Sequence, residues 1–158
     1  AAKMASAKLI GAPAPMQALM QRVSHASVAI DGETTATIGR GLLLLLGIQK
    51  HDDAATAVKT LQRVLDYRVF ADNDGKMNCS LRDVGGELLV VSQFTLAADT
   101  GKGRRPSFAS AMPPLQAEAL YNHFTALAAA SDVETACGEF GADMQVSLCN
   151  DGPVTFLL

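Results

Sequence analysis

Three polar residues interrupt the end of an otherwise apolar segment, and they are the first candidates for chemistry. Ser92, Gln93 and Thr95 follow two valines in the run ELLVVSQFTL, residues 87–96. Polar groups at the end of a strand cost free energy unless they are paired, so we expect them to line a pocket or to bond a loop. The plainer alternative is a strand that runs into solvent. In the first interpretation, Thr95 is a nucleophile or a contact beside an oxyanion.

No base for Thr95 is visible in the sequence. A threonine hydroxyl is a weak nucleophile without one, and none of the histidines at positions 25, 51 and 123 belongs to a local motif that would supply it. His123 is expected on the apolar face of a helix, where a packing role is the usual one. His51 precedes a helix start and is expected to be exposed.

A glycine-rich loop between Ala97 and Ser107 concentrates positive charge. It holds Lys102, Arg104 and Arg105 in a chain whose formal net charge is −3, or −5 without the two lysines of residues 1–15. Overall charge therefore counts against nonspecific nucleic-acid binding but leaves room for a local basic patch. Basic loops are usually solvated surfaces. The closeness of this loop to the polar strand end favours an anionic substrate, and phosphate suits arginine and backbone N–H groups.

The last nine residues, NDGPVTFLL, join a tight-turn signal to an apolar end. Chain termini are usually polar and frayed, so an apolar terminus predicts a last strand buried in a sheet. Gly152-Pro153 is then a stiff turn before that strand. X-Pro bonds are cis in only about 5–6% of cases in folded proteins, so the sequence alone assigns no cis bond here.

Bulk composition bounds the class of protein. The chain has 158 residues, of which 49% are apolar and 18% charged, and this suits one soluble domain with a sizeable core. No apolar run approaches the roughly 20 residues of a membrane-spanning helix. The three cysteines form no Cys-x-x-Cys pair, so the sequence predicts neither a zinc site nor a disulfide framework, and a cytoplasmic location is the simplest. Residues 1–15 are Ala-rich and aperiodic, and we expect an expression leader there, before a domain at 16–158.

Two kinds of element are predicted to position these residues. Apolar and β-branched segments predict strands at 17–23, 26–30, 34–38, 42–48, 69–70, 87–96, 133–140, 144–148 and the C-terminal segment. One helix is predicted from an N-cap at Asp52 or Asp53 to near Tyr67. A second opens at Pro113-Pro114, with an apolar face that includes Ala119, Leu120, His123, Phe124 and Leu127. Two helices cannot cover both faces of so large a sheet. The expected fold is a single α/β domain with a three-layer α/β/β arrangement, a mixed sheet and two main helices.

Taken together, these motifs resemble the D-aminoacyl-tRNA deacylases over residues 16–158. The residues that carry the resemblance are Gln21-Arg22-Val23, the segment 84–96 with Ser92-Gln93-Phe94-Thr95, then Arg105-Pro106-Ser107-Phe108, and last Asn150-Asp151-Gly152-Pro153-Val154-Thr155. The Ser-Gln-Phe-Thr and Gly-Pro-Val-Thr motifs in this order, at this chain length, are highly specific. Residues 1–15 lie outside the family pattern.

The resemblance implies a hydrolase that needs no cofactor or metal. It implies cleavage of the ester that joins a D-amino acid to the 3′ end of tRNA, and of glycine mischarged on alanine tRNA. The active enzyme would be a cytoplasmic homodimer with an active site at each subunit interface. By the same resemblance the Ser92–Thr95 segment is catalytic, and Lys102, Arg104 and Arg105 contact the tRNA.

Chiral selection is implied for Gly152-Pro153, joined by a cis bond and inserted into the pocket of the partner subunit. Its carbonyl oxygens would hold the α-amino group of the substrate and leave no room for an L side chain. Arg22 would help to fix this motif, and Met144 would pack against it. Enantiomers share every functional group, so only the direction of the side chain separates them, and a backbone clash rejects one hand whatever the side chain is. Glycine has no side chain, so it would not be rejected in this way.

Two mechanisms and two rival functions stay open at this point. Either Thr95 attacks the ester, or the terminal ribose 2′-OH of the tRNA assists while backbone N–H groups around Phe94 and Thr95 stabilise the oxyanion. The second is favoured because that hydroxyl already lies beside the ester. The rival functions are a non-catalytic module that binds RNA ends through the basic loop, and a metal-dependent esterase, which no ligand cluster supports.

Overall fold

The computed structural model describes residues 16–158. In chain order the elements are β1 (Gln17–Ile30), β2 (Glu33–Ile38), β3 (Gly41–Gly47), α1 (Ala54–Asp66), β4 (Phe70–Ala71), β5 (Met77–Cys79), β6 (Glu87–Ser92), the short 3₁₀ helix η1 (Phe94–Ala97), α2 (Pro114–Ala129), β7 (Thr135–Cys137) and β8 (Gln145–Leu157). The leader expected at residues 1–15 lies outside the described residues. No helix in the described part of the chain is long and apolar enough to cross a membrane.

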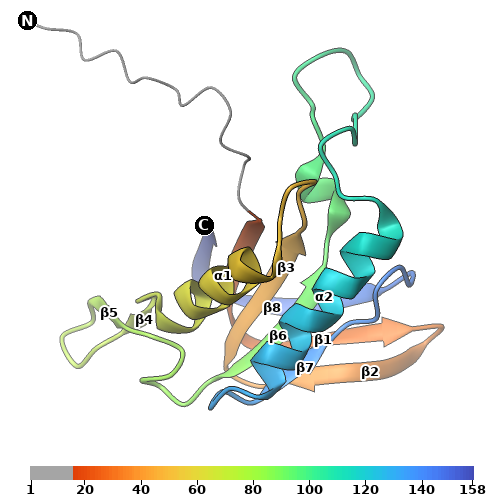
Figure 1. Cartoon of the computed structure of the whole chain (residues 1–158). Coiled ribbons are helices and arrows are strands. Elements are labelled where there is room, and N and C mark those ends of the chain that lie inside the picture. The colour runs from red at the N-terminus through yellow and green to blue at the C-terminus, as the bar shows by residue number, and fades with distance from the viewer. Residues whose placement is uncertain (1–15) are drawn as a thin grey trace, which may run out of the picture.

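The main sheet folds over to make two layers, and the helices add a third (Figure 1). Its strand order is β2-β1-β3-β6-β7, with β8 paired to the other side of β1. The pairs β3–β6 and β6–β7 are parallel, whereas all pairs of β1 are antiparallel. β1 bridges the two sheet layers, because its first half pairs with β3 and its second half with β2. The predicted three-layer domain with a mixed sheet and two main helices is confirmed.

The leucines of β3 alternate between two apolar cores. Leu42, Leu44 and Leu46 face the helices, whereas Leu43 faces the space between the two sheet layers. All four side chains are 0% exposed. A strand that is covered on both faces has a continuous apolar sequence, which is why this segment was predicted correctly.

The prediction that Ser24 and His25 separate two strands was wrong. β1 runs through them for 14 residues, and β8 pairs with it on both sides of this point, with register shifts between Gln21 and His25. Both side chains are exposed. The polar pair interrupts the apolar pattern because the bulge turns these side chains outward, and not because the strand ends.

Three further strand predictions were wrong in their bounds. β6 ends at Ser92, where its pairing with β3 ends at Leu46, and the chain then turns into η1. The strand predicted at 133–140 is only the three residues of β7, and the strand at 144–148 continues into the terminal one as β8. Strand ends depend on which neighbour is available for pairing, and the local sequence does not contain that information.

The C-terminal strand is paired but not buried, contrary to the prediction. The N–H of Leu158 donates to the carbonyl of Ala18 at 2.9 Å. Leu157 is nevertheless 60% exposed and Phe156 37% exposed. Backbone pairing therefore fixes this terminus, while the side chains of Phe156 and Leu157 stay largely exposed and only Leu158 packs partly against the core.

The predicted apolar face of α2 is buried only in part: Phe124 is buried and Leu120 and Leu127 pack partly buried against the core, whereas Ala119 is exposed. The buried residues of the helix are Ala117, Tyr121, Phe124 and Ala128. His123, which was expected to pack, is exposed. Alanine and leucine occur all around this helix, so periodicity did not single out one face.

Asp53 is the residue that caps α1. Its carboxylate accepts hydrogen bonds from the Thr56 N–H at 2.8 Å and the Thr56 hydroxyl at 2.9 Å, and these bonds lower the pKa of Asp53. Asp52 is buried instead and accepts from the N–H of Gln49 at 2.6 Å. Burial raises the pKa of Asp52.

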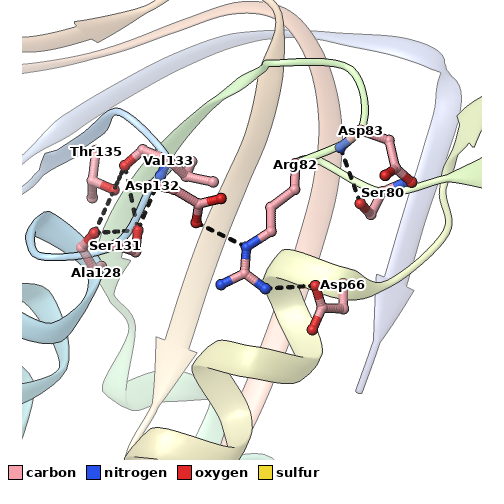
Figure 2. A network of polar contacts seen from close by, with 9 residues as sticks. All are labelled: Asp66, Ser80, Arg82, Asp83, Ala128, Ser131, Asp132, Val133 and Thr135. Carbon is pink, nitrogen blue, oxygen red and sulfur yellow. Dashed lines mark hydrogen bonds and ion pairs between the residues drawn. The ribbon is translucent and has the colours of Figure 1, made fainter.

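Arg82 links the ends of the two long helices (Figure 2). Its Nη1 donates to Asp66, the last residue of α1, at 2.6 Å, and its Nε donates to Asp132, just beyond α2, at 2.9 Å. The hydrogen bond from Arg82 lowers the pKa of Asp132. Since both carboxylates are more than half exposed, the clamp aligns the helices more than it stabilises them.

Candidate active site

A cavity of about 700 Å³ opens where β6 ends. One wall is Ser92, Gln93 and Phe94, and the facing wall is the segment 140–146, which leads into β8. The residues before α2 and its first turns close a third side. The volume and the mostly apolar lining are typical of a small-molecule site.

The polar residues after β6 sit on a tight backbone turn. The N–H of Gln93 still bonds to the carbonyl of Leu46 at 2.8 Å, and η1 follows. Within η1 the first bonded N–H is that of Leu96, to the carbonyl of Gln93 at 3.1 Å. The N–H groups of Phe94 and Thr95 are therefore left without an acceptor inside the turn, as at any helix start. Ser92 and Gln93 line the cavity, as one of the two interpretations predicted, whereas Thr95 is not among the described lining residues.

The Thr95 hydroxyl bonds to the side chain of Gln93. The amide nitrogen Nε2 of Gln93 donates to Thr95 Oγ1. An amide NH₂ is a donor and cannot take a proton from the hydroxyl. Among the lining residues within 16–158, Asp143 is the only one that can ionise, and its side chain is exposed.

Two aromatic rings lie at the cavity and join the basic loop to it. Phe94 and Phe108 pack with ring centroids 5.1 Å apart, and they are 60% and 38% exposed. The loop between them is closed by reciprocal backbone bonds between Asp99 and Ser107, at 2.7 and 2.9 Å. Its cations at positions 102, 104 and 105 are exposed, and they form no ion pair within residues 16–158.

The facing wall contains residues that sequence reasoning mostly missed. Met144 was predicted, but Phe140 and Asp143 were not. The Met144 sulfur lies over Gly138, where an added Cβ would come within 2.7 Å of it. No local motif marks this segment, because it becomes a wall only when β7 and β8 bring it opposite η1.

Gly152-Pro153 lies on a protruding bulge of β8. Gln21 pairs with Thr155 and Val23 with Asn150, so residues 151–154 stand opposite a single residue of β1. The Gly152-Pro153 bond is cis, and both residues are exposed. Neither belongs to the described lining of the cavity.

Side-chain hydrogen bonds pin the bulge on both sides. Arg22 Nε donates to the Asp151 carbonyl at 3.0 Å, while Arg22 Nη1 donates to the Val69 carbonyl at 2.8 Å. Across the bulge, Asn150 Oδ1 accepts from the Val154 N–H at 2.8 Å, and Asn150 Nδ2 donates to Thr155 Oγ1 at 2.9 Å. Arg22 therefore contacts the bulge beside Gly152, and Asn150 is an additional support that sequence reasoning had not assigned.

No histidine or cysteine is among the described lining residues of the cavity. The three histidines are exposed, and none lines the cavity. Within residues 16–158, no group of three or more His, Cys, Asp or Glu side chains is arranged to hold a metal ion.

Comparison with known proteins gives consistent matches. Residues 19–158 match the family model described as D-Tyr-tRNA(Tyr) deacylase. A protein named D-aminoacyl-tRNA deacylase from Pseudoalteromonas translucida (strain TAC 125) is 59% identical over 143 residues, which are 90% of this chain and 99% of that protein. A protein of the same name from Stutzerimonas stutzeri (strain A1501) matches with the same identity and coverage.

Solved structures share the fold. The c-Myc DNA Unwinding Element Binding Protein superposes with a TM-score of 0.84 at 43% identity, over 90% of this chain and 97% of the other. A structure described as a probable eukaryotic D-amino acid tRNA deacylase superposes with a TM-score of 0.80 over 90% and 98% of the two chains. Its identity of 14% makes it a likeness of fold alone.

Proposed function

The chain belongs to the D-aminoacyl-tRNA deacylase family and is thus a hydrolase of the aminoacyl-tRNA ester bond; from this premise we propose that its active site is completed between two copies of the chain. Membership of a family of hydrolases argues against the alternative function, a non-catalytic module that binds RNA ends. Each site would combine the cavity of one subunit with the Gly152-Pro153 bulge of its partner.

The observation that carries the proposal is the separation of two groups of site residues within one chain. Ser92, Gln93, Phe94 and Met144 surround the cavity, whereas the bulge is exposed further along β8. Val146 lines the cavity and Gly152 lies six residues beyond it, roughly 20 Å at the rise of an extended strand. The bulge is held by Arg22 and Asn150, and Asp151, Gly152 and Pro153 stay exposed among residues 16–158, so it is suited to contact a second subunit. Closed twofold dimers bring such distant surfaces together twice.

The position of the bulge backbone would then select D-aminoacyl over L-aminoacyl substrates. The bulge presents carbonyl oxygens for the α-amino group of the substrate, and its pinned backbone occupies the place where an L side chain would point. Rejection of L-aminoacyl-tRNA needs no recognition of the side chain. Glycyl-tRNA has no side chain to reject, so its hydrolysis follows from the same geometry.

For the chemical step, we favour assistance by the terminal 2′-OH of the tRNA. The Thr95 hydroxyl has an amide and not a base as its partner. The unbonded N–H groups at the start of η1 are suitable donors to a developing oxyanion, provided that the ester carbonyl points towards them. The protein would supply position and charge stabilisation, and the substrate would supply the hydroxyl.

The tRNA end would be held outside the cavity. Exposed rings of Phe94 and Phe108 offer a stacking surface for a terminal base, and Lys102, Arg104 and Arg105 offer cations for the phosphates. Aminoacyl-tRNA is present where translation occurs, so we place the enzyme in the cytoplasm.

Mixing two inactive variants tests the shared site. Gln93→Ala damages the cavity side. Gly152→Ala damages the bulge, because an added Cβ would lie 2.6 Å from Val154 Cγ2 at a φ of +136°, which L residues rarely adopt. In a fully exchanged equimolar mixture half of the dimers are mixed, and each has one intact site, so we expect recovery of about a quarter of the wild-type rate on D-tyrosyl-tRNA.

The separate variants serve as controls, and each should have little activity. A mixture that stays as inactive as its components would contradict the shared site, as would a purely monomeric enzyme with full activity. Gly152→Ala should also change the ratio of the rates on D- and L-tyrosyl-tRNA. Unchanged rates on both substrates would refute the selective role of the bulge.

A further inference from the structure

Tyr121 is a buried phenol whose hydroxyl reaches two segments at once. The side chain is 2% exposed. Its hydroxyl lies 2.7 Å from the carbonyl oxygen of Gly138 and 3.1 Å from that of Val90. A phenol has a single proton to donate, so the nearer carbonyl receives most of it. Burial raises the pKa of Tyr121, and the hydroxyl therefore stays protonated at neutral pH.

The two carbonyls mark the point where β6 and β7 diverge. The last pair between these strands is Val90 with Cys137, and the next N–H, that of Gly138, donates to the Val90 carbonyl at 2.8 Å. Beyond this fork, β6 leads to the Ser92–Phe94 wall of the cavity. The chain after Gly138 leads to the facing wall with Phe140 and Met144.

The ring of Tyr121 also supports the facing wall. Its centroid lies 5.8 Å from that of Phe140, which lines the cavity. One turn earlier on α2, Ala117 contributes to the lining as well. Tyr121 itself is not among the lining residues, so any effect that it has on the reaction passes through the walls.

We infer that Tyr121 is a positioning residue for deacylation, whose hydroxyl holds the two walls of the cavity at the separation that aligns the ester with the N–H groups of Phe94 and Thr95. The inference rests on the proposed function of the cavity. Catalytic rates are highly sensitive to alignment, since a misplacement of about 1 Å can cost roughly 100-fold. A fork that loosens by a fraction of that distance should slow the chemical step and leave tRNA binding largely intact.

Tyr121→Phe tests this inference because it keeps the ring and removes only the hydroxyl. We expect kcat on D-tyrosyl-tRNA to fall about tenfold at 25 °C, with KM within about twofold of wild type, because the tRNA contacts lie outside the cavity. Ser131→Ala is the matched control. Its hydroxyl donates to the Ala128 carbonyl at 2.6 Å and accepts from the Val133 N–H at 3.2 Å near the far end of α2 (Figure 2). This variant therefore also loses hydrogen bonds to backbone, but at a residue outside the described lining of the cavity.

The control variant should keep the wild-type kcat. A purely structural role of Tyr121 would give equal kcat values for the two variants, and that result would overturn the inference, as would a rise in KM with kcat unchanged. Gln93→Ala is assayed in parallel. If Gln93→Ala is fully active, the proposed function of the cavity fails; if it is inactive while Tyr121→Phe keeps its kcat, only the present inference fails.

Discussion

At the scale of single residues, the candidate site within residues 16–158 offers hydrogen-bond donors next to Thr95 and no base bonded to its hydroxyl. The Thr95 hydroxyl is bonded by the Gln93 amide, and the sole ionisable residue of the described lining is Asp143, at an exposed position. An enzyme with this arrangement has little means to turn Thr95 into a nucleophile. It is better equipped to hold a substrate that brings its own hydroxyl.

Thr95→Ala distinguishes the two mechanisms. If the tRNA 2′-OH assists, the variant should keep more than about a tenth of the wild-type rate in a single-turnover assay with D-tyrosyl-tRNA, because Thr95 contributes only position. A tRNA that ends in a 2′-deoxyribose should instead lose most of its reactivity, on the order of 100-fold or more. If the Thr95→Ala variant loses nearly all turnover but still binds tRNA, Thr95 acts as the nucleophile and assistance by the 2′-OH is refuted.

At the scale of elements, caps and short links set where the helices begin and end. α1 starts at Asp53 because its carboxylate satisfies an N–H of the first turn. The end of α1 and the turn after α2 are joined through Arg82. These contacts lie on the outside of the molecule, so they align the helices that cover β3 and β6 without contributing to the cavity.

The cap of α1 should make stability depend on pH. The Thr56 hydrogen bonds lower the folded-state pKa of Asp53, so its contribution is fully present above the ordinary aspartate pKa and is lost as the pH falls through the lowered value. Asp53→Ala should therefore reduce stability to urea clearly at neutral pH and much less at about pH 2. Asp74→Ala is a suitable control, because its exposed carboxylate accepts no hydrogen bond within residues 16–158. An equal loss for Asp53→Ala at both pH values would contradict this account.

At the scale of the whole molecule, the fold depends on a second core between the two sheet layers. Leu43 lies there with Val23, Val28, Ile38 and Leu89. These residues come from four strands, so the core forms only when the sheet has folded over. The same folding places the start of β8 at the cavity and the bulge far from it.

Leu43→Ala should destabilise the protein by about 2–5 kcal/mol in urea unfolding, because it leaves a cavity in a fully buried core. Val58→Ala, at a position 38% exposed on α1, should cost less than about 1 kcal/mol. The measurement is made at two protein concentrations, since dissociation of a dimer adds a concentration-dependent term. Similar losses for both variants would contradict the two-core description.

The sequence by itself determined the fold class, the start of α1, the central strand and the motifs that identify the family. Each of these depends on local information: an N-cap at Asp52 or Asp53, a continuous apolar run at 42–48, and residue types in a fixed order. The polar end of β6 was expected to line a pocket or to bond a loop for a local reason too, since unpaired polar groups need partners, but the sequence did not exclude a strand that runs into solvent.

Only the tertiary structure decided which strands continue and what faces the pocket. The bulge at Ser24-His25, the merging of two predicted strands into β8 and the exposure of the C-terminal side chains depend on pairing between segments far apart in sequence. The Phe140–Met144 wall and the fork at Tyr121 have no local signature, because packing of β7, β8 and α2 creates them. The stiff Gly152-Pro153 turn was visible in the sequence, but that it protrudes from an edge strand, pinned by Arg22 and Asn150, required the fold.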